Sequence, residues 1–135
     1  MRKSRLVLIG ESDERGGNSY QLFAQESTSY TVEVIRTQRE MDARVRELMM
    51  DCTLPLAIFL DGEMPSRAGE RALDTLVLLR TIRHEHSYGG IIIGTAGNPQ
   101  IRNMQKDSGC TYVMDGKSGD DLFGLLDQIV DARGP

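Results

Sequence analysis

Short apolar runs alternate with longer segments of helical period along this chain, and the alternation recurs five times. The runs predicted to form strands are 6–9, 31–35, 57–60, 91–93 and 112–114. The run at 91–93 is continuous and β-branched, which is typical of a strand buried on both faces. The run at 31–35 alternates apolar and polar residues, as a half-buried edge strand does.

Segments with helical spacing lie between and after these runs, and they predict helices over about 19–26, 39–50, 68–85, 98–108 and 120–132. Asn98 and Pro99 resemble a helix start, with Asn as the cap and Pro in the first helical position. One side of the long helix at 68–85 is predicted to consist of Ala72, Leu73, Leu76, Leu79 and Ile82. A (βα)5 order with right-handed crossovers implies an α/β fold, with helices on both faces of a parallel sheet.

Length and composition narrow the classes of protein to consider. The 135 residues predict a single domain, 1–135, of ordinary globular composition, with 39% apolar and 27% charged residues. A formal net charge of -4 argues against direct nucleic-acid binding, because a phosphate backbone requires a basic surface. No signal peptide or apolar stretch of membrane-spanning length is visible. We therefore expect a cytoplasmic protein without membrane contact.

Polar residues with candidate chemistry stand where the predicted strands end. Glu11 follows the first strand, Asp61 the third and Thr95 the fourth, while Lys117 follows the fifth. Open parallel sheets gather reactive groups at the carboxyl ends of their strands. Two acids there suit Mg²⁺, a carboxylate can attack phosphorus to give an acyl phosphate, and a lysine and a hydroxyl can bind phosphoryl oxygens. The pattern predicts a phosphoryl-transfer site.

Three motifs in this order make the chain resemble the receiver domain of two-component response regulators over nearly all of its length. Asp61-x-x-Met64-Pro65-x-x-x-Gly69 resembles the family's phosphoacceptor strand, its turn and the start of its third helix. Thr95-Ala96 resembles the switch hydroxyl and the small residue after it, and Lys117 stands close to the position of the strand-five lysine. The resemblance implies a flavodoxin-like doubly wound fold with a five-stranded parallel sheet of order 2-1-3-4-5.

The segment 79–83 resembles the end of the family's third helix, but it lies about four residues later in this chain than the family pattern places it. Four residues are close to one helical turn, so we predict that the extra residues lengthen the helix without rotating its apolar side. The strand-five region also departs from the family pattern. Lys117 follows Gly116 and precedes Ser118, where the family has lysine followed by proline, and the switch aromatic is Tyr112 or is replaced by Met114.

The resemblance implies a role for each candidate residue. Asp61 accepts a phosphoryl group from a partner histidine kinase or phosphotransfer protein, Thr95 moves toward it, and Lys117 pairs with it. Glu11 and Asp61 bind Mg²⁺ together with the backbone carbonyl of Glu63. Phosphorylation then switches the face formed by the fourth helix, fifth strand and fifth helix, which an output protein, an effector domain or a second copy of the chain would bind.

Only one acid follows the first strand, in Gly10-Glu11-Ser12, where receivers carry two. Weak Mg²⁺ binding is one consequence, and it leaves open a pseudo-receiver, in which the fold serves as a protein-binding module without phosphorylation. A third interpretation is a haloacid dehalogenase-like phosphohydrolase, which Asp61-Gly62-Glu63 superficially resembles. Those enzymes carry the nucleophile on their first strand with a cap insertion, whereas here a βα unit precedes it. We therefore expect that the chain is not an enzyme and that its only catalytic activity is its own phosphorylation and dephosphorylation.

Overall fold

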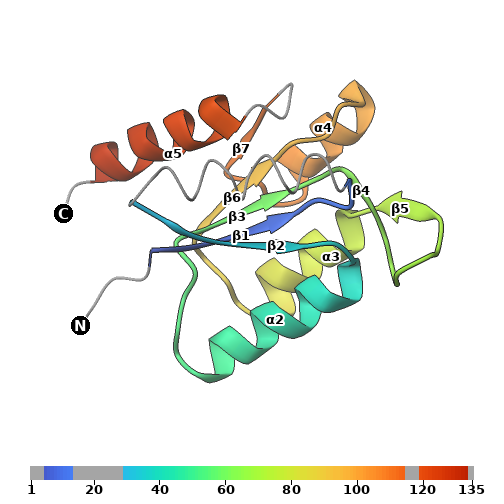
Figure 1. The fold of residues 1–135 in the computed structure, drawn as a ribbon. Coiled ribbons are helices and arrows are strands. Elements are labelled where there is room, and N and C mark those ends of the chain that lie inside the picture. Colours follow the sequence, from blue (N-terminus) through green and yellow to red (C-terminus); the bar gives the residue numbers. More distant parts are fainter. Residues whose placement is uncertain (1–4, 14–28, 115–118, 134–135) are drawn as a thin grey trace.

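A five-stranded parallel sheet forms the centre of the computed structural model (Figure 1). The structure describes residues 5–13, 29–114 and 119–133. The strands of this sheet are β1 (Leu6–Gly10), β2 (Thr31–Ile35), β3 (Ala57–Leu60), β6 (Ile91–Gly94) and β7 (Tyr112–Val113). Their spatial order is β2-β1-β3-β6-β7, and all neighbours pair in parallel. The predicted order 2-1-3-4-5 and the flavodoxin-like α/β class are confirmed.

Helices cover both faces of the sheet. They are α2 (Gln38–Met50), α3 (Leu76–Arg80), the π-helical turn η1 (Thr81–Glu85), α4 (Pro99–Asp107) and α5 (Gly119–Arg133). In Figure 1, α2 and α3 lie under the sheet and α5 lies above it. The predicted helix at 19–26 lies outside the described residues. No helix in the described part of the chain is long and apolar enough to span a membrane.

Side chains of the sheet divide between two apolar cores because successive residues of a strand point to opposite faces. Leu8, Ile58 and Ile92 pack toward α2 and α3. Val7, Phe59 and Ile93 pack toward α5, where Phe123 meets Phe59 edge to face at a ring-centroid distance of 5.3 Å. Each fully buried side chain of this size stabilises the fold by about 1.5–3 kcal/mol, so both faces fix the register of the strands.

Capping residues set the starts of two helices, and one of them, Asn98, was predicted from the sequence. The Asn98 side chain accepts hydrogen bonds from the backbone N–H groups of Gln100 and Ile101, and Pro99 occupies the first turn of α4. The Thr37 side chain accepts from the N–H of Glu40 at the start of α2. These side chains satisfy backbone donors that a helix start leaves without intrahelical partners.

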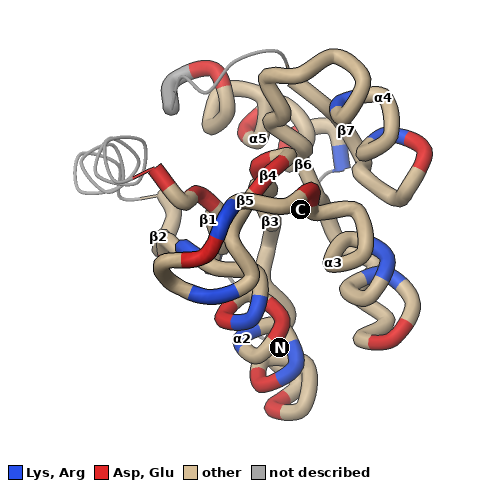
Figure 2. The backbone as a smooth tube through the Cα atoms, turned by 90° about the vertical axis from the view of Figure 1, so that its right-hand side faces the viewer, with Lys and Arg blue, Asp and Glu red and all other residues tan. Residues whose placement is uncertain are grey.

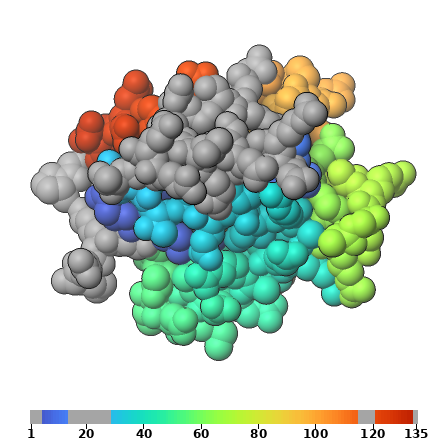
Figure 3. All heavy atoms as spheres, in the orientation of Figure 1, coloured from blue at the N-terminus to red at the C-terminus, as the bar shows by residue number. Residues whose placement is uncertain are grey.

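The segment after Asp61 corrects the prediction of a helix over 68–85. Its first part forms an antiparallel hairpin of β4 (Glu63–Pro65) and β5 (Ala72–Asp74), and the helix begins only at Leu76. Gly69, at the tip, has a φ of 85°, a left-handed conformation that glycine adopts without steric cost. The extra residues therefore build a hairpin instead of a longer helix. Figure 3 shows this hairpin projecting from the molecule beside α4.

The apolar side predicted for this segment is correct only for the part that is helical. Leu76, Leu79 and Ile82 are buried, whereas Ala72 and Leu73 lie exposed on β5. Gln38 of α2 holds the hairpin in place, since its side-chain amide donates to the carbonyl oxygen of Met64 at 2.8 Å and to those of the facing strand. Hydrogen bonds and not apolar packing thus position β5.

Candidate functional site

The parallel hydrogen-bond ladder continues one residue beyond the ends of the central strands. Gly10, Leu60 and Gly94 lie level with one another in β1, β3 and β6. The next backbone N–H groups still donate to carbonyl oxygens of the neighbouring strand. The N–H of Glu11 donates to Ile35 and that of Asp61 to Gly10, both at 3.0 Å. The N–H of Thr95 donates to Leu60 at 3.0 Å, and that of Met114 donates to Gly94 at 2.9 Å. Neighbouring strands lie about 4.8 Å apart. The structure therefore brings Glu11, Asp61 and Thr95 together on adjacent strand ends.

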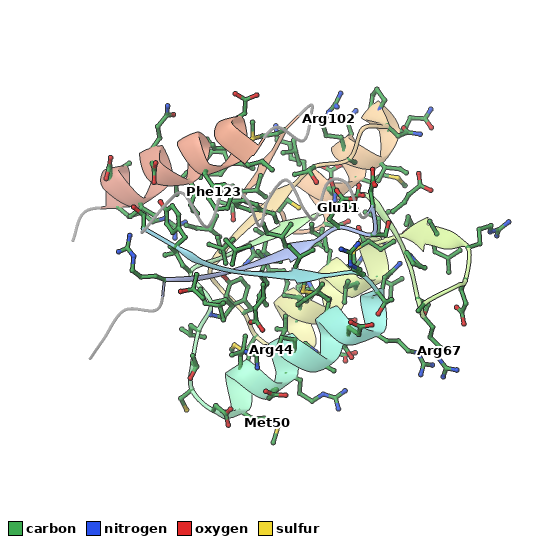
Figure 4. All side chains as sticks on the ribbon, viewed as in Figure 1. Glu11, Arg44, Met50, Arg67, Arg102 and Phe123 are labelled. Carbon is green, nitrogen blue, oxygen red and sulfur yellow. The ribbon has the colours of Figure 1, made fainter. Side chains whose placement is uncertain are left out.

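These three residues also share one side of the sheet. The period of two along a strand places them with Ile9, Phe59 and Ile93, toward the core that contains α5. Figure 2 looks onto this rim and shows acidic positions near its centre, and Figure 4 places Glu11 at the same end of the sheet. The gathering of the predicted acids at one rim matches the sequence-based expectation, while their chemical roles stay predictions.

Both carboxylates of the rim are buried. Glu11 is 1% exposed and its Oε1 accepts a hydrogen bond from the N–H of Asp13 at 3.0 Å. Asp61 is 8% exposed and its Oδ1 accepts from the N–H of Gly62 at 2.7 Å. Burial of two like charges on neighbouring strand ends is unfavourable, and a cation between them relieves it. Carboxylate oxygens are the donors that Mg²⁺ prefers, so this pair fits the metal that the sequence predicts.

The side chain of Glu63 is exposed, and its predicted part in metal binding involves only its backbone carbonyl. The N–H of Thr75 donates to the carbonyl of Gly62 at 3.0 Å, so these two residues form a hydrogen-bonded pair at the base of the hairpin. Hydrogen-bonded and non-bonded pairs alternate along an antiparallel ladder, which makes Glu63 and Asp74 a non-bonded pair. The Glu63 carbonyl therefore points out of the hairpin, as its predicted part in metal binding requires.

Thr75 is a site residue that the sequence analysis missed. It is fully buried, and its hydroxyl donates to the carbonyl oxygen of Asp61 at 2.7 Å. Together with the bond to Gly62, this contact ties the base of the hairpin to the end of β3. Thr75 precedes a helix, where a threonine usually caps, but its hydroxyl makes no capping bond to α3. Its bond to Asp61 depends on the hairpin, which the sequence pattern did not reveal.

Gln105 is a second residue that the sequence analysis missed. This amide on α4 is completely buried beneath the rim, and it bonds to Leu60 and Ala96, the neighbours of Asp61 and Thr95. A signal for it exists in the sequence, because Gly94 ends a run of three isoleucines and a glycine inside a strand often marks a close approach. A Cβ on Gly94 would lie 2.4 Å from Oε1 of Gln105.

The other predicted site residues are less central. Lys117 lies outside the described residues. Tyr112 is 45% exposed on β7, and Ser12, which follows Glu11, is half-buried. Within the described ranges, no group of three or more His, Cys, Asp or Glu side chains could hold a metal. A metal at this rim would therefore depend on two carboxylates and the main-chain oxygen of Glu63.

A cavity of about 640 Å³ opens near the other end of the sheet, beside the residues that lead into β6. Arg83 occupies its polar side and donates to the carbonyl oxygens of Tyr88, Gly90 and Gly109. Burial lowers the pKa of the Arg83 guanidinium from its ordinary value, yet these bonds make it a link between loops. This cavity does not contact the rim, so we place the candidate chemistry at the strand ends.

Solved structures that are similar to this chain include several receiver domains. The receiver domain of the histidine kinase CKI1 from Arabidopsis thaliana, in a mutant form, matches with a TM-score of 0.75 at 17% identity, over 96% of this chain and 91% of that chain. The same domain complexed with Mg²⁺ and BeF₃⁻ gives 0.74 at 17% identity, with the same coverage. A Francisella response regulator receiver domain gives 0.71 at 16% identity, over 96% and 99%.

Neither a protein-family model nor a curated protein sequence matches this chain. The likeness is therefore one of structure, and it extends over almost the whole of each compared domain. This chain has the receiver-domain fold, which confirms at the level of the fold the resemblance seen in its motifs.

Proposed function

We propose that this chain is a receiver domain of two-component signalling, in which Asp61 accepts a phosphoryl group from a histidine kinase or a phosphotransfer protein. The observation that carries this proposal is the placement of Glu11, Asp61 and Thr95 on adjacent strand ends at one rim. Ligands of open α/β sheets bind at this rim, outside the carboxyl ends of the strands. The receiver-domain fold of the chain supports the same function.

The transfer uses the Asp61 carboxylate as the nucleophile. One of its oxygens attacks phosphorus, a new P–O bond forms, and the bond from phosphorus to the imidazole nitrogen of the donor breaks. The electron pair of that bond stays on the imidazole, and Asp61 becomes an acyl phosphate. The N–H of Gly62 holds Oδ1 of the carboxylate. The Thr95 hydroxyl donates to a phosphoryl oxygen, and Lys117 pairs with the phosphoryl group, as the sequence resemblance implies.

Mg²⁺ is the proposed cofactor, and its ligands from the protein would be Glu11, Asp61 and the backbone carbonyl of Glu63. When bound, it supplies positive charge that offsets the charge of the phosphoryl oxygens. Because only one acid is present in Gly10-Glu11-Ser12, we expect weaker binding than a site with three carboxylates would give. The Mg²⁺ and BeF₃⁻ in the complexed histidine-kinase receiver domain are consistent with this assignment.

The output surface is the face of α4, β7 and α5. Phosphorylation replaces the single negative charge of the Asp61 carboxylate by a phosphoryl group with close to two negative charges and three acceptor oxygens, which changes the hydrogen bonding of the strand ends. Met104 on α4 and Tyr112 on β7 are 52% and 45% exposed, so apolar side chains already lie on this face. Tyr112 is the candidate switch aromatic, and an output protein or an effector domain is the proposed partner.

Acetyl phosphate tests the proposal without a cognate kinase. Incubation with Mg²⁺ and acetyl phosphate is expected to add one phosphoryl group, detected by intact-protein mass spectrometry. The Asp61→Asn variant should lose the adduct, whereas Asp74→Asn, a matched change at an exposed aspartate of the hairpin, should keep it. An unmodified wild-type protein at saturating Mg²⁺ would contradict the proposal, as would an equal adduct in Asp61→Asn.

A pseudo-receiver is the second candidate, and the single acid in Gly10-Glu11-Ser12 favours it. With two carboxylates and not three, the rim offers a divalent ion fewer charges than the receivers that the sequence resembles. In this case the wild-type protein takes up no phosphoryl group, and the α4, β7 and α5 face binds its partner equally well in Asp61→Asn. Steady hydrolysis of a phosphomonoester would instead support the haloacid dehalogenase-like alternative.

A further inference from the structure

One buried side chain of α4 contacts both loops that carry the candidate chemistry. The Gln105 side-chain N–H donates from Nε2 to the carbonyl of Leu60 at 3.0 Å, and Oε1 accepts from the N–H of Ala96 at 3.4 Å. Leu60 directly precedes Asp61, and Ala96 directly follows Thr95. The carbonyl of Leu60 also accepts from the N–H of Thr95 at 3.0 Å. The amide therefore joins α4 to both strand ends.

A second side chain of the same helix holds the other side of the Ala96 residue. Nη1 of Arg102 donates to the Ala96 carbonyl at 3.3 Å, while Gln105 accepts from its N–H. Residues three apart share one face of a helix, so both side chains reach the loop from the same side of α4. Figure 4 shows Arg102 on α4 at the end of the sheet where Glu11 also lies.

The packing around these bonds leaves little free space. A Cβ on Gly94 would lie 2.4 Å from Oε1 and 2.8 Å from Cδ of Gln105. A Cβ on Gly62, the residue after Asp61, would lie 2.4 Å from Cβ of Ala96 and 2.9 Å from Cγ2 of Ile101. Two glycines thus allow α4 and the two loops to approach more closely than other residues would permit, and a loop movement cannot be absorbed by a gap.

We infer that Gln105, assisted by Arg102, is a positioning residue that makes α4 follow the Thr95–Ala96 loop when Thr95 moves toward a phosphoryl group on Asp61. This inference rests on the proposed function. Hydrogen bonds weaken beyond about 3.5 Å, so a displacement of about 1 Å either carries the helix along or breaks these contacts. Met104, between the two positioning residues in the sequence, is exposed on the same helix and would move with it.

Hydrogen–deuterium exchange of residues 99–107, measured with Mg²⁺ before and after addition of acetyl phosphate, tests the inference. The substitution Gln105→Met keeps the length of the side chain and removes both amide contacts. Gln100→Met makes the same change at an exposed position of α4 and serves as the matched control. We expect all three proteins to gain the Asp61 adduct. The wild type and Gln100→Met should show a phosphorylation-dependent change in α4 exchange, which Gln105→Met should lose.

The outcomes separate the inference from the proposed function. A wild type without an adduct overturns both of them. If all proteins gain the adduct, two results overturn the inference alone. One is an α4 exchange that does not respond in the wild type, and the other is a response that is equal in Gln105→Met. If the thermal melt shows that Gln105→Met is unfolded, the half-buried Arg102→Met is measured in the same way. A reduced response in Arg102→Met supports the inference, and an unchanged one overturns it.

Discussion

The chain segments before and after Asp61 are held in place by different interactions. The residues before it belong to β3, which is buried on both faces and paired on both edges. The residues after it form the β4–β5 hairpin. Its second strand is entirely exposed, and it is held by hydrogen bonds from Gln38 to the carbonyls of Leu73 and Asp74 and by Thr75 at its end. Apolar burial therefore fixes the rim and, through Met64, the first strand of the hairpin, whereas a few polar contacts hold the second strand.

Removal of core volume beneath the rim should have the largest effect. Ile58 is fully buried in β3, three residues before Asp61, and Ile58→Ala is expected to lower the free energy of unfolding by about 2–5 kcal/mol because it leaves a cavity. Urea denaturation measures this change. Val77→Ala, at an exposed apolar residue of α3, should change it by less than about 0.5 kcal/mol. Similar costs for the two substitutions would contradict the role given to the core.

The contact that joins the two regions should have the next largest effect. Thr75→Val keeps the shape of the side chain but removes the hydroxyl that donates to the carbonyl of Asp61. A buried acceptor that loses its donor costs about 1–3 kcal/mol, measurable by the same denaturation. Thr75→Ser retains a hydroxyl and should lose less. A Thr75→Val protein as stable as the wild type would show that the hairpin and β3 are not joined by this bond.

Metal binding at the rim should produce a smaller, ligand-dependent effect. At Mg²⁺ concentrations of ten times the dissociation constant, binding to the folded state adds about 1.4 kcal/mol of stability. Glu11→Gln should abolish this increase, while Glu63→Gln should retain it because only the backbone of Glu63 is proposed to bind. Thermal melts with and without Mg²⁺ give both values. A Mg²⁺ effect that disappears in Glu63→Gln and survives in Glu11→Gln would reverse the assignment.

A change at the hairpin tip should have the smallest effect. Gly69 has a φ of 85° and no atom within 4 Å of the position of a Cβ, so Gly69→Ala meets only backbone strain. We expect a loss of about 1 kcal/mol by thermal denaturation. Gly97 is equally open but lies outside the left-handed region, and Gly97→Ala should not destabilise the protein. A larger loss in Gly69→Ala than in Thr75→Val would mean that the turn, not its base, holds the hairpin.

The sequence predicted the regular part of the fold because burial repeats with a clear period there. Ile91–Ile93 could only be a strand covered on both sides, and Asn98 marked the start of α4 through chemistry that is local to it. The order of the strands followed from the family resemblance. The gathering of Glu11, Asp61 and Thr95 followed from their common position after parallel strands, which is a property of the sheet and not of the residues themselves.

The sequence failed where spacing alone is ambiguous. Leu73, Leu76 and Leu79 stand three apart, which fits one side of a helix, yet Leu73 belongs to a hairpin strand and the other two to a helix. Gly69 was assigned to the start of a helix, whereas its positive φ forms a tip. Gln105 was missed because a polar residue on a helix normally faces solvent. Its burial depends on two strand ends that are distant in the sequence.

The hairpin tip offers a practical place to attach a reporter group. Residues 67–74 are all exposed, and Thr75 and Gln38 hold the base of the hairpin, so a label there would not disturb either core. Figure 4 shows Arg67 directed away from the molecule. The chain contains no tryptophan, so a single Trp introduced at the tip would be the source of all tryptophan fluorescence of the protein.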